Sequence, residues 1–511
     1  MGRIIIKSGI EAIKAEYKEQ VIPDYTGNPF IEALPPIYST GEVIERISIY
    51  PPFSDKERLL EKQYKIHLVQ RLFQCFQPLT IHLDLESRLS RIIRQGYLAR
   101  NSFDPKYRHN FINSNSVINN MNHDLNHNEL FRSTGASLTI IGISGIGKTT
   151  AINRILSLYP QVIIHSKYKD KNFSMYQITW LKIDCPHDGS LKGLCVEFFL
   201  KIDSILGTNY YQKFGQGRLS VNTMLPAMAK IAINIGLGLL IIDEVQNLNE
   251  ARSGGADKML NFFVGLTNLG IPNVLVGTPS AMSILQSKFR QARRGSGQGD
   301  LVWDRLKNDE NWDLLMNAIW DYQWNRNVTI LDKKISDTLY EESQGITDIA
   351  VKLYAMSQIR SMMSGTEVIT SELIQSVAKE NFKLVKPMID ALKTSDIKKI
   401  ALYEDIATDM TDFMGLISGS NNYVTEMKIA AIREHKRDNK SENALINNDA
   451  ILNKIENKKT AVKKVNNYGQ DDIRYVVANA RKELKSAYDT LSDIGIIIKY
   501  EDDLFLNEDA L

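Results

Sequence analysis

The apolar residues of this chain fall into two kinds of pattern, short runs and longer stretches with a single apolar face. Short, mainly apolar runs bounded by glycine, proline or acidic residues are typical of strands buried in a parallel sheet. They cover residues 136–141, 239–242 and 273–277. Apolar residues spaced three or four apart predict amphipathic helices. They cover residues 55–74, 85–96, 191–206 and 222–235. This alternation of strands and helices predicts an α/β fold around a parallel sheet.

The first run leads directly into a glycine-rich turn, Gly142-Ile-Ser-Gly-Ile-Gly-Lys-Thr-Thr150, and then into an amphipathic stretch. This is the G-x-x-x-x-G-K-[ST] pattern of a phosphate-binding loop. Inward-pointing N–H groups and the following helix N-terminus would form a positive concavity. Lys148 would add a charge for the β- and γ-phosphates, and Thr149 a hydroxyl for Mg²⁺. The alternative is a turn that binds nothing. The predicted cofactor-binding residues of the loop are Gly142, Ser144, Gly145, Ile146, Gly147, Lys148, Thr149 and Thr150.

The second run ends in two acidic residues, Asp243 and Glu244. Acids at the end of a buried strand are costly unless they serve a cation. We therefore predict that Asp243 and Thr149 hold Mg²⁺, and that Glu244 is the general base that activates the attacking water. The alternative is a strand that ends in a solvated acidic turn, which is less favoured downstream of a phosphate-binding loop.

The third run ends at Thr278, immediately before Pro279. Thr278 could lie between the two nucleotide-binding strands and sense the γ-phosphate, a catalytic role. Alternatively, Thr278 could cap the next predicted helix, residues 280–286. The spacing alone does not distinguish these two roles.

The order of these three elements, a phosphate loop, an acidic strand and a third strand, resembles that of the AAA+ ATPases. The closer resemblance is to the TnsC-type ATPase regulators of multi-protein cut-and-paste DNA transposons, and a looser one is to TniB and MuB. The likeness covers roughly residues 20–395 and returns faintly at residues 472–475. Besides the three strands it is carried by residues 28–36, 76–79, 96–97, 100–101, 181–185, 189–192, 252–255, 260–264, 292–295, 343–346 and 351–353.

The resemblance implies an AAA+ P-loop fold with a helical lid, ATP and Mg²⁺ as cofactors, and hydrolysis of ATP to ADP and phosphate. It also implies a homo-oligomer, a ring or helical filament, on double-stranded DNA. In such a system the assembly links a target-selector protein to transposase and endonuclease subunits, the latter held by the C-terminal tail.

Three arginines lie before a glycine-rich stretch that follows the third strand: Arg290, Arg293 and Arg294. In an oligomeric ATPase, an arginine of one subunit reaches the γ-phosphate bound by its neighbour. A guanidinium suits this task because it is always charged and binds phosphate bidentately. We predict Arg293 or Arg294 in this catalytic role, with Arg290 behind them. The alternative is a basic helix end that complements the helix dipole.

Two β-rich runs, residues 161–165 and 177–184, flank a polar and basic tip. The tip carries Lys167, Tyr168, Lys169 and Lys171. Lysines there could follow a DNA backbone while the tyrosine ring contacts sugar or base. An ordinary hairpin tip is an equally good interpretation from the residues, and the resemblance favours DNA. Arg252 and Lys258, in and after a small-residue loop, are further DNA candidates.

Further candidates lie in the helical stretch before the phosphate loop and in the lid. Tyr97 is a candidate wall of the adenine site. The helical stretch before it carries Arg88, Arg91 and Arg94 on one face, which could contact phosphates or form a solvated face. In the lid, Asp348 takes the place of an arginine that senses nucleotide in many AAA+ proteins, and Lys352, one turn later, could substitute for it.

The predicted organisation has seven parts. They are an extended N-terminal arm (1–55), a helical N-terminal segment (56–130), the ATPase core (131–300), a helical lid (301–395), a short helical extension (396–432), a polar linker (433–467) and a partner-binding tail (468–511). The arm could pack on a partner, as the resemblance suggests, or on its own domain. The linker is poor in large apolar residues, so it cannot bury enough surface to offset the entropy of ordering.

Composition limits the partners and the compartment. A net charge of only +2 means that any DNA site must be local. The three cysteines, Cys75, Cys185 and Cys195, lack metal-ligand spacing and are predicted to be reduced core residues, which suits the cytoplasm. No apolar run is long enough to span a membrane, and the N-terminus is too short for a secretory signal.

Three other functions compete with the transposition regulator. The first is another AAA+ protein, a helicase or an initiator loader, although no winged helix is recognisable at the C-terminus. The second is a metabolic P-loop kinase, which would need a small acceptor pocket and no arginine from a neighbour. The third is a scaffold that binds ATP without hydrolysing it, against which Glu244 argues.

Overall fold

The computed structural model describes residues 3–104, 136–217, 219–251, 255–282, 285 and 298–394. All of them belong to one compact unit of the chain. The predicted helical extension, polar linker and partner-binding tail lie outside the described residues. None of the helices in the described part of the chain is long and apolar enough to cross a membrane.

The centre of the unit is a parallel sheet of five strands, in the order β6-β7-β8-β3-β9. The strands are β3 (Ser137–Gly142), β6 (Leu181–Asp184), β7 (Leu240–Asp243), β8 (Asn273–Gly277) and β9 (Asp300–Trp303). The three predicted strands are therefore confirmed, and β8 lies between β3 and β7. The edge strand β9 was not predicted, because only Leu301 and Trp303 of its four residues are buried.

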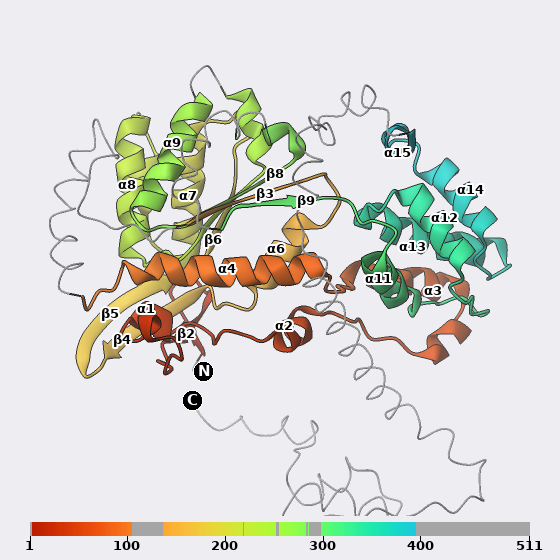
Figure 1. Cartoon of the computed structure of the whole chain (residues 1–511), viewed down its shortest axis with the longest axis horizontal. Coiled ribbons are helices and arrows are strands. Elements are labelled where there is room, and N and C mark those ends of the chain that lie inside the picture. Colours follow the sequence, from red (N-terminus) through yellow and green to blue (C-terminus); the bar gives the residue numbers. More distant parts are fainter. Residues whose placement is uncertain are drawn as a thin grey trace, which may run out of the picture. The chain divides into compact units, whose positions relative to one another are not determined.

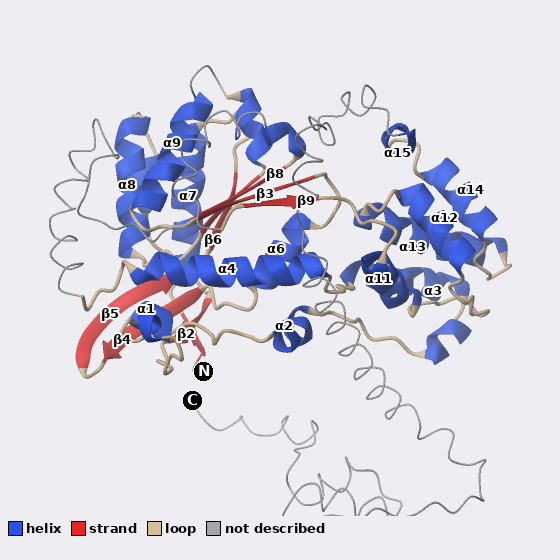
Figure 2. Ribbon diagram, viewed as in Figure 1, coloured by secondary structure: helices blue, strands red, loops and turns tan. Residues whose placement is uncertain are grey.

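Helices cover both faces of this sheet (Figures 1 and 2). One face packs against α7 (Leu191–Leu206), α8 (Val221–Asn234) and α9 (Gly255–Asn268). The other packs against α4 (Thr80–Leu98) and α6 (Lys148–Leu156). The apolar stripes that predicted α7 and α8 are buried in the core, which is why the sequence pattern located both helices.

A second sheet joins the N-terminal arm to the ATPase core. It has the order β1-β2-β4-β5, formed by β1 (Arg3–Ile5), β2 (Glu11–Lys14), β4 (Val162–Tyr168) and β5 (Lys171–Ile178). The arm strand β2 pairs in parallel with β4, so the arm packs on its own domain. Its short helices follow as η1 (Pro23–Tyr25), α1 (Pro29–Glu32) and α2 (Thr40–Ile47).

The lid is a helical cluster with its own core. It contains α11 (Glu310–Trp320), α12 (Lys333–Ser343), α13 (Thr347–Ser364), α14 (Ser371–Asn381) and α15 (Lys386–Thr394). Trp312, Trp320 and Trp324 are buried in this core. Leu72 and Val69, from a segment far earlier in the chain, complete it.

That earlier segment, residues 55–74, was predicted as one helix and is three pieces. They are η2 (Asp55–Leu59), α3 (Lys62–Leu68) and η3 (Val69–Gln74). The break lies at Leu60 and Glu61, which are extended. Leu59, an apolar residue of the predicted helix, is 76% exposed, so its apolar face does not continue across the break. The remaining short helices are η4 (Tyr211–Gly215), η5 (Val245–Glu250) and η6 (Pro279–Ala281).

Candidate functional site

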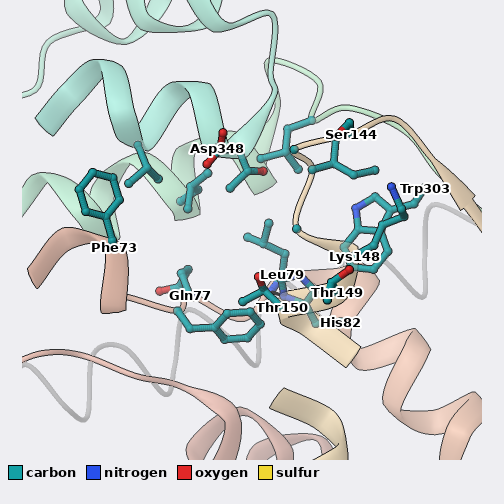
Figure 3. Close-up of a pocket in the computed structure, with 18 of the residues that line it drawn as sticks. Phe73, Gln77, Leu79, His82, Ser144, Lys148, Thr149, Thr150, Trp303 and Asp348 are labelled. Atoms are coloured by element: carbon teal, nitrogen blue, oxygen red, sulfur yellow. Dashed lines mark hydrogen bonds between the residues drawn. The ribbon is translucent and has the colours of Figure 1, made fainter. Parts of the chain in front are cut away.

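A cavity of about 500 Å³ lies where the phosphate loop, the ends of β7 and β8, the start of α4 and the lid meet (Figure 3). Its volume is in the range of small-molecule sites. The predicted residues that line it are Ser144, Gly145, Ile146, Gly147, Lys148, Thr149, Thr150, Asp243, Glu244 and Thr278. The fold thus brings together residues from three strands that the sequence analysis selected separately.

The phosphate loop is already shaped as a concave turn. Gly145 and Gly147 have positive φ angles of 80° and 94°, a conformation that favours glycine. Gly142 does not line the cavity; a Cβ at this position would lie 2.4 Å from the Trp303 carbonyl oxygen, so glycine lets β9 approach. The Lys148 ammonium donates to the carbonyl oxygens of Gly142 at 2.6 Å and Ile143 at 2.9 Å, inside the loop itself.

The phosphate loop and the acidic strand are joined by a direct hydrogen bond. The Thr149 hydroxyl donates to a carboxylate oxygen of Asp243 at 2.9 Å, and Asp243 is only 4% exposed. A hydroxyl and a carboxylate are hard oxygen ligands of the kind that Mg²⁺ prefers. The pair Thr149 and Asp243 therefore fits the predicted metal position.

Lys182 is a site residue that the sequence analysis missed. Its ammonium lies 2.9 Å from the same Asp243 oxygen that Thr149 contacts. Lys182 comes from β6, which runs parallel to β7 and pairs with it through Lys182 and Ile241. It lies within the segment 181–185 that carries the family resemblance, but only the strand pairing reveals its carboxylate partner. Lys182 thus gives the buried Asp243 carboxylate a counter-charge.

Glu244, the predicted base, has a positive φ of 58°, an uncommon conformation for a residue with a side chain. It is exposed to the cavity, and the Gln246 side-chain amide donates to its carboxylate. The Gln246 amide oxygen in turn accepts from the backbone N–H of Thr278 at 3.2 Å. Gln246 therefore bridges the ends of β7 and β8, and it too was missed from the sequence.

Thr278 lies at the end of β8, between the two nucleotide-binding strands, and lines the cavity. It also occupies the first position before the short helix η6, but its side chain makes no capping hydrogen bond. Its hydroxyl instead contacts the Ser280 hydroxyl at 2.9 Å. This geometry matches the sensor interpretation better than the capping one.

The rest of the cavity lining is mainly apolar and comes from segments that the sequence analysis did not assign to the site. This apolar end of the cavity consists of Leu72, Phe73, Phe76, Leu79, Leu315, Ile319 and Val351. Tyr97, the predicted adenine wall, does not line the cavity; it is fully buried and donates its hydroxyl to the Gly236 carbonyl oxygen. That prediction was wrong. The cavity meets the beginning of α4, whereas Tyr97 lies near the end of the helix, about five turns away.

The cysteines also depart in part from their prediction. Cys185 and Cys195 are buried, whereas Cys75 is only partly buried and lines the cavity. Burial raises the pKa of the Cys185 and Cys195 thiols to about 12, so both are inert at neutral pH.

The lid contacts the phosphate loop directly. The backbone N–H of Asp348 donates to the Gly145 carbonyl oxygen at 3.0 Å. Asp348 lines the cavity, and Lys352, the proposed substitute for a sensing arginine, pairs with the Asp348 carboxylate at 2.6 Å. Of these two described residues only Asp348 faces the cavity, so an acid stands where many AAA+ lids place a cation.

The basic residues outside the cavity divide into two groups. Arg94 is buried and donates to the Pro35 carbonyl oxygen, and Arg88 pairs with Asp84, so neither faces phosphate nor forms a fully solvated face. Lys167, Lys169 and Lys171 are exposed at the β4–β5 tip, where a two-residue turn joins the strands. Tyr168 is 2% exposed, so its ring is not available to contact a sugar or base as predicted.

Four predicted arginines lie outside the described residues: Arg252, Arg290, Arg293 and Arg294. Lys258 is exposed on α9.

Comparison with known proteins agrees with this geometry. Residues 131–285 match the model of the AAA domain family. No curated protein matches the chain significantly. The β9-β3-β8-β7-β6 order, with the phosphate loop after β3 and the acids after β7, is the parallel-sheet core of an α/β P-loop domain.

Several solved structures are similar to the chain. The ORC2 protein of Aeropyrum pernix in ADPNP–ADP complexes shares 15% identity over 48% of this chain and 62% of that chain, with a TM-score of 0.32. The ORC1 protein of A. pernix in complex with DNA shares 14% sequence identity over 58% of this chain and 71% of that chain, with a TM-score of 0.35. Domain III of the Thermotoga maritima replication initiation protein DnaA shares 16% sequence identity over 53% of this chain and 91% of that chain, with a TM-score of 0.27. The chain thus spans less than two thirds of the length of ORC2. The fold assignment depends on the strand order and on the family match.

Proposed function

We propose that the cavity binds ATP with Mg²⁺ and hydrolyses the nucleotide to ADP and phosphate. The observation that carries this proposal is the hydrogen bond of 2.9 Å between Thr149 of the phosphate loop and Asp243 of the acidic strand. Glu244 and Thr278 line the same cavity, so a metal position, a base and a sensor converge on one place. When bound, Mg²⁺ would be held by Thr149 and Asp243 and would neutralise charge that develops on the phosphates.

The residues of the chain have distinct tasks in this reaction. Lys148 exchanges its contacts with the loop carbonyl oxygens for the β- and γ-phosphates. Glu244 accepts a proton from the attacking water, and Gln246 holds its carboxylate beside Thr278. The apolar end of the cavity takes the base. Because the lid contributes Leu315, Ile319 and Val351 to that end, nucleotide binding also stabilises the contact between lid and core.

We further propose that this ATPase is a TnsC-type regulator of DNA transposition that assembles on double-stranded DNA when ATP is bound. The assembly would be a ring or helical filament that links a target selector to transposase and endonuclease subunits. Support comes from the sequence resemblance over roughly residues 20–395 and from the exposed lysines at the β4–β5 tip. An arginine finger, Arg293 or Arg294, would tie assembly to the γ-phosphate of the neighbouring subunit.

The test is the binding of the full chain to a labelled duplex of arbitrary sequence with ATP, a non-hydrolysable analogue, ADP or no nucleotide, with the complexes sized at the same time. We expect large complexes only with ATP or the analogue. Binding confined to one DNA sequence and independent of oligomer size would favour an initiator loader. A monomer that ignores DNA in every nucleotide state would exclude the transposition regulator and direct attention to phosphate acceptors.

Replacing the three tip lysines, Lys167, Lys169 and Lys171, by glutamine should weaken DNA binding and make it less sensitive to salt. Each phosphate contact that is lost lowers the slope of log affinity against log salt by about 0.9. The measurement is DNA affinity at several salt concentrations with the ATP analogue present. The matched control replaces three exposed lid lysines, Lys333, Lys379 and Lys383, by glutamine. Equal loss in both variants would show a general charge effect and contradict a DNA site at the tip.

Replacing Lys182 by methionine should destabilise the nucleotide-free protein, because it removes the counter-charge of the buried Asp243 carboxylate. Breaking a buried pair costs about 3–5 kcal/mol, and the partial exposure of Lys182 makes about 2 kcal/mol a better expectation. Mg²⁺ with ADP should restore part of the loss, since the metal supplies the missing positive charge. Thermal unfolding with and without Mg²⁺·ADP measures both effects. Lys182→Arg, which keeps the charge, should remain close to the wild-type protein. Equal stabilisation of all three proteins by Mg²⁺·ADP would refute the link to the metal.

A further inference from the structure

We propose that His82 recognises the base of the bound nucleotide by donating a hydrogen bond from its Nε2–H to a ring nitrogen of adenine. This inference rests on the proposed function, because it assigns a ligand contact inside the ATP cavity. It adds a base-reading residue that lies outside the phosphate loop, the acidic strand and the lid.

The protonation state of His82 is set by its own helix. The backbone N–H of Leu79 donates to Nδ1 of His82 at 2.9 Å, as part of the cap at the start of α4. A nitrogen that accepts a hydrogen bond carries a lone pair, so the proton of the neutral ring must lie on Nε2. Burial lowers the pKa of His82 to about 3, so the ring is neutral at physiological pH. Nε2 is therefore a fixed donor without a positive charge.

The ring is also held in place. It stacks on Phe76 with the ring centres 4.9 Å apart, and Trp303 lies against it at 5.4 Å. His82 is only 6% exposed, yet it is one of the side chains that line the cavity (Figure 3). Leu79 and Phe76, its neighbours, are among the apolar side chains that line the cavity.

The Nε2–H has no hydrogen-bond partner within the residues that the structure describes; the only hydrogen bond of the His82 side chain is the one that Nδ1 accepts. The Nε2 atom is not one of the fully buried, unpartnered polar atoms of the described residues, so its N–H is reached from the cavity and can donate to a ligand with a suitably placed acceptor. Since His82 lines the cavity, the nucleotide is the ligand that can supply that acceptor.

A neutral N–H donor suits the acceptor atoms of a purine. The ring nitrogens of adenine that are free in a nucleotide, N1, N3 and N7, are all acceptors. Guanine keeps N3 and N7 as acceptors but carries a proton on N1, so the hydrogen bond separates adenine from guanine only when it is made to N1. Pyrimidines have a smaller ring system that would fill less of the cavity. Phosphate would be recognised better by a cation, which His82 is not at neutral pH. His82 is therefore expected to contribute to base selectivity and not to charge neutralisation.

The test compares three proteins with a series of diphosphates in the presence of Mg²⁺, using calorimetric titration of the full-length chain. His82→Asn retains an acceptor oxygen that can cap the Leu79 N–H but has no donor at the Nε2 position. His82→Gln reaches that position with an amide N–H. The ligands are ADP, its 1-deaza, 3-deaza and 7-deaza analogues, GDP and CDP, and thermal unfolding reports on folding of each variant.

We expect wild-type protein to bind one of the three deaza analogues about tenfold more weakly than ADP, the size of one hydrogen bond lost in a buried site. His82→Asn should bind ADP about tenfold more weakly and no longer distinguish ADP from that analogue, and His82→Gln should recover part of the difference. An equal loss for every ligand, CDP included, would show that His82 only supports the fold and would overturn the inference. Wild-type affinity for ADP in His82→Asn would overturn it as well. If wild-type protein binds none of the nucleotides, the ATP cavity itself is refuted.

Discussion

Replacing Glu244 by glutamine is expected to lower the rate of ATP hydrolysis by about 10²- to 10⁴-fold, the usual contribution of a general base. Glutamine keeps the size of the side chain and can still contact Gln246, but it cannot accept the proton of the attacking water. Nucleotide affinity should change little, because the phosphate loop, Asp243 and the apolar end of the cavity remain. ATP should therefore bind and persist, and assemblies on DNA should last longer than those of the wild-type chain.

Phosphate release and the dissociation rate of DNA-bound complexes measure the two consequences. Glu250→Gln is the matched control, since Glu250 is an exposed acid at the end of η5, six residues further along the chain and outside the cavity lining. Unchanged turnover in Glu244→Gln would remove Glu244 from the catalytic role. Loss of nucleotide binding together with turnover would show instead that Glu244 holds the ligand or the shape of the turn at φ 58°.

The sequence predicted the phosphate end of the site because each of its parts is local. The phosphate loop is one contiguous turn, and Asp243 and Glu244 end a run that could only be a buried strand. Parallel strands place their carboxyl ends at one edge, so the convergence of Thr149, Asp243 and Thr278 followed from three separate short patterns.

The base end could not be predicted in the same way, because it is assembled from segments that are distant in the chain. Lys182 meets Asp243 only through the pairing of β6 with β7, and His82, near the start of α4, lines one cavity with the phosphate loop and the lid only in the folded chain. No periodicity encodes such contacts. Tyr97 is an opposite case, a residue that the sequence placed in the site and the fold does not. It is aromatic and precedes the phosphate loop, but helix α4 carries it into the core beside Gly236.

The position of the N-terminal arm is decided by strand pairing, which its local composition does not reveal. Its prolines predicted extended chain, and the residues alone left open whether it would pack on a partner or on its own domain. The structure places β2 beside β4, the strand that leads to the lysine-rich tip. Arm and tip therefore belong to one sheet, and a target-selector contact with the arm would act on the same element that is proposed to contact DNA.

The second large effect is expected from Gly345, which connects α12 to α13 in the lid. Its φ is 73°, and a Cβ placed on it would lie 2.0 Å from the Leu306 carbonyl oxygen, a backbone atom that cannot rotate away. The two segments are also joined by a hydrogen bond of 3.0 Å from the Leu306 N–H to the Gly345 carbonyl oxygen. Gly345→Ala must therefore move one backbone segment against the other.

We expect Gly345→Ala to lower the free energy of unfolding by about 3–5 kcal/mol, adding the strain of a positive φ to that of an overpacked contact. Gly365→Ala is the matched control. Gly365 follows the C-terminal end of α13 and also has a positive φ, 80°, but the space around its Cβ position is open. The free energy of unfolding of Gly365→Ala should fall by only about 1 kcal/mol. Urea unfolding of both variants measures the difference, and equal losses would mean that the Leu306 segment yields without cost.

Gly345→Ala should also weaken nucleotide binding, although Gly345 does not line the cavity. Three residues later, the Asp348 N–H donates to the Gly145 carbonyl oxygen of the phosphate loop, and Ile346 packs beside Gly145. A shift of Gly345 would therefore reach the loop that is proposed to hold the phosphates and the lid residues that are proposed to hold the base. Titration of ADP under conditions where both variants remain folded would separate this effect from stability. Affinity should fall for Gly345→Ala and stay unchanged for Gly365→Ala, whereas equal affinities would show that the lid holds its position on the phosphate loop independently of this turn.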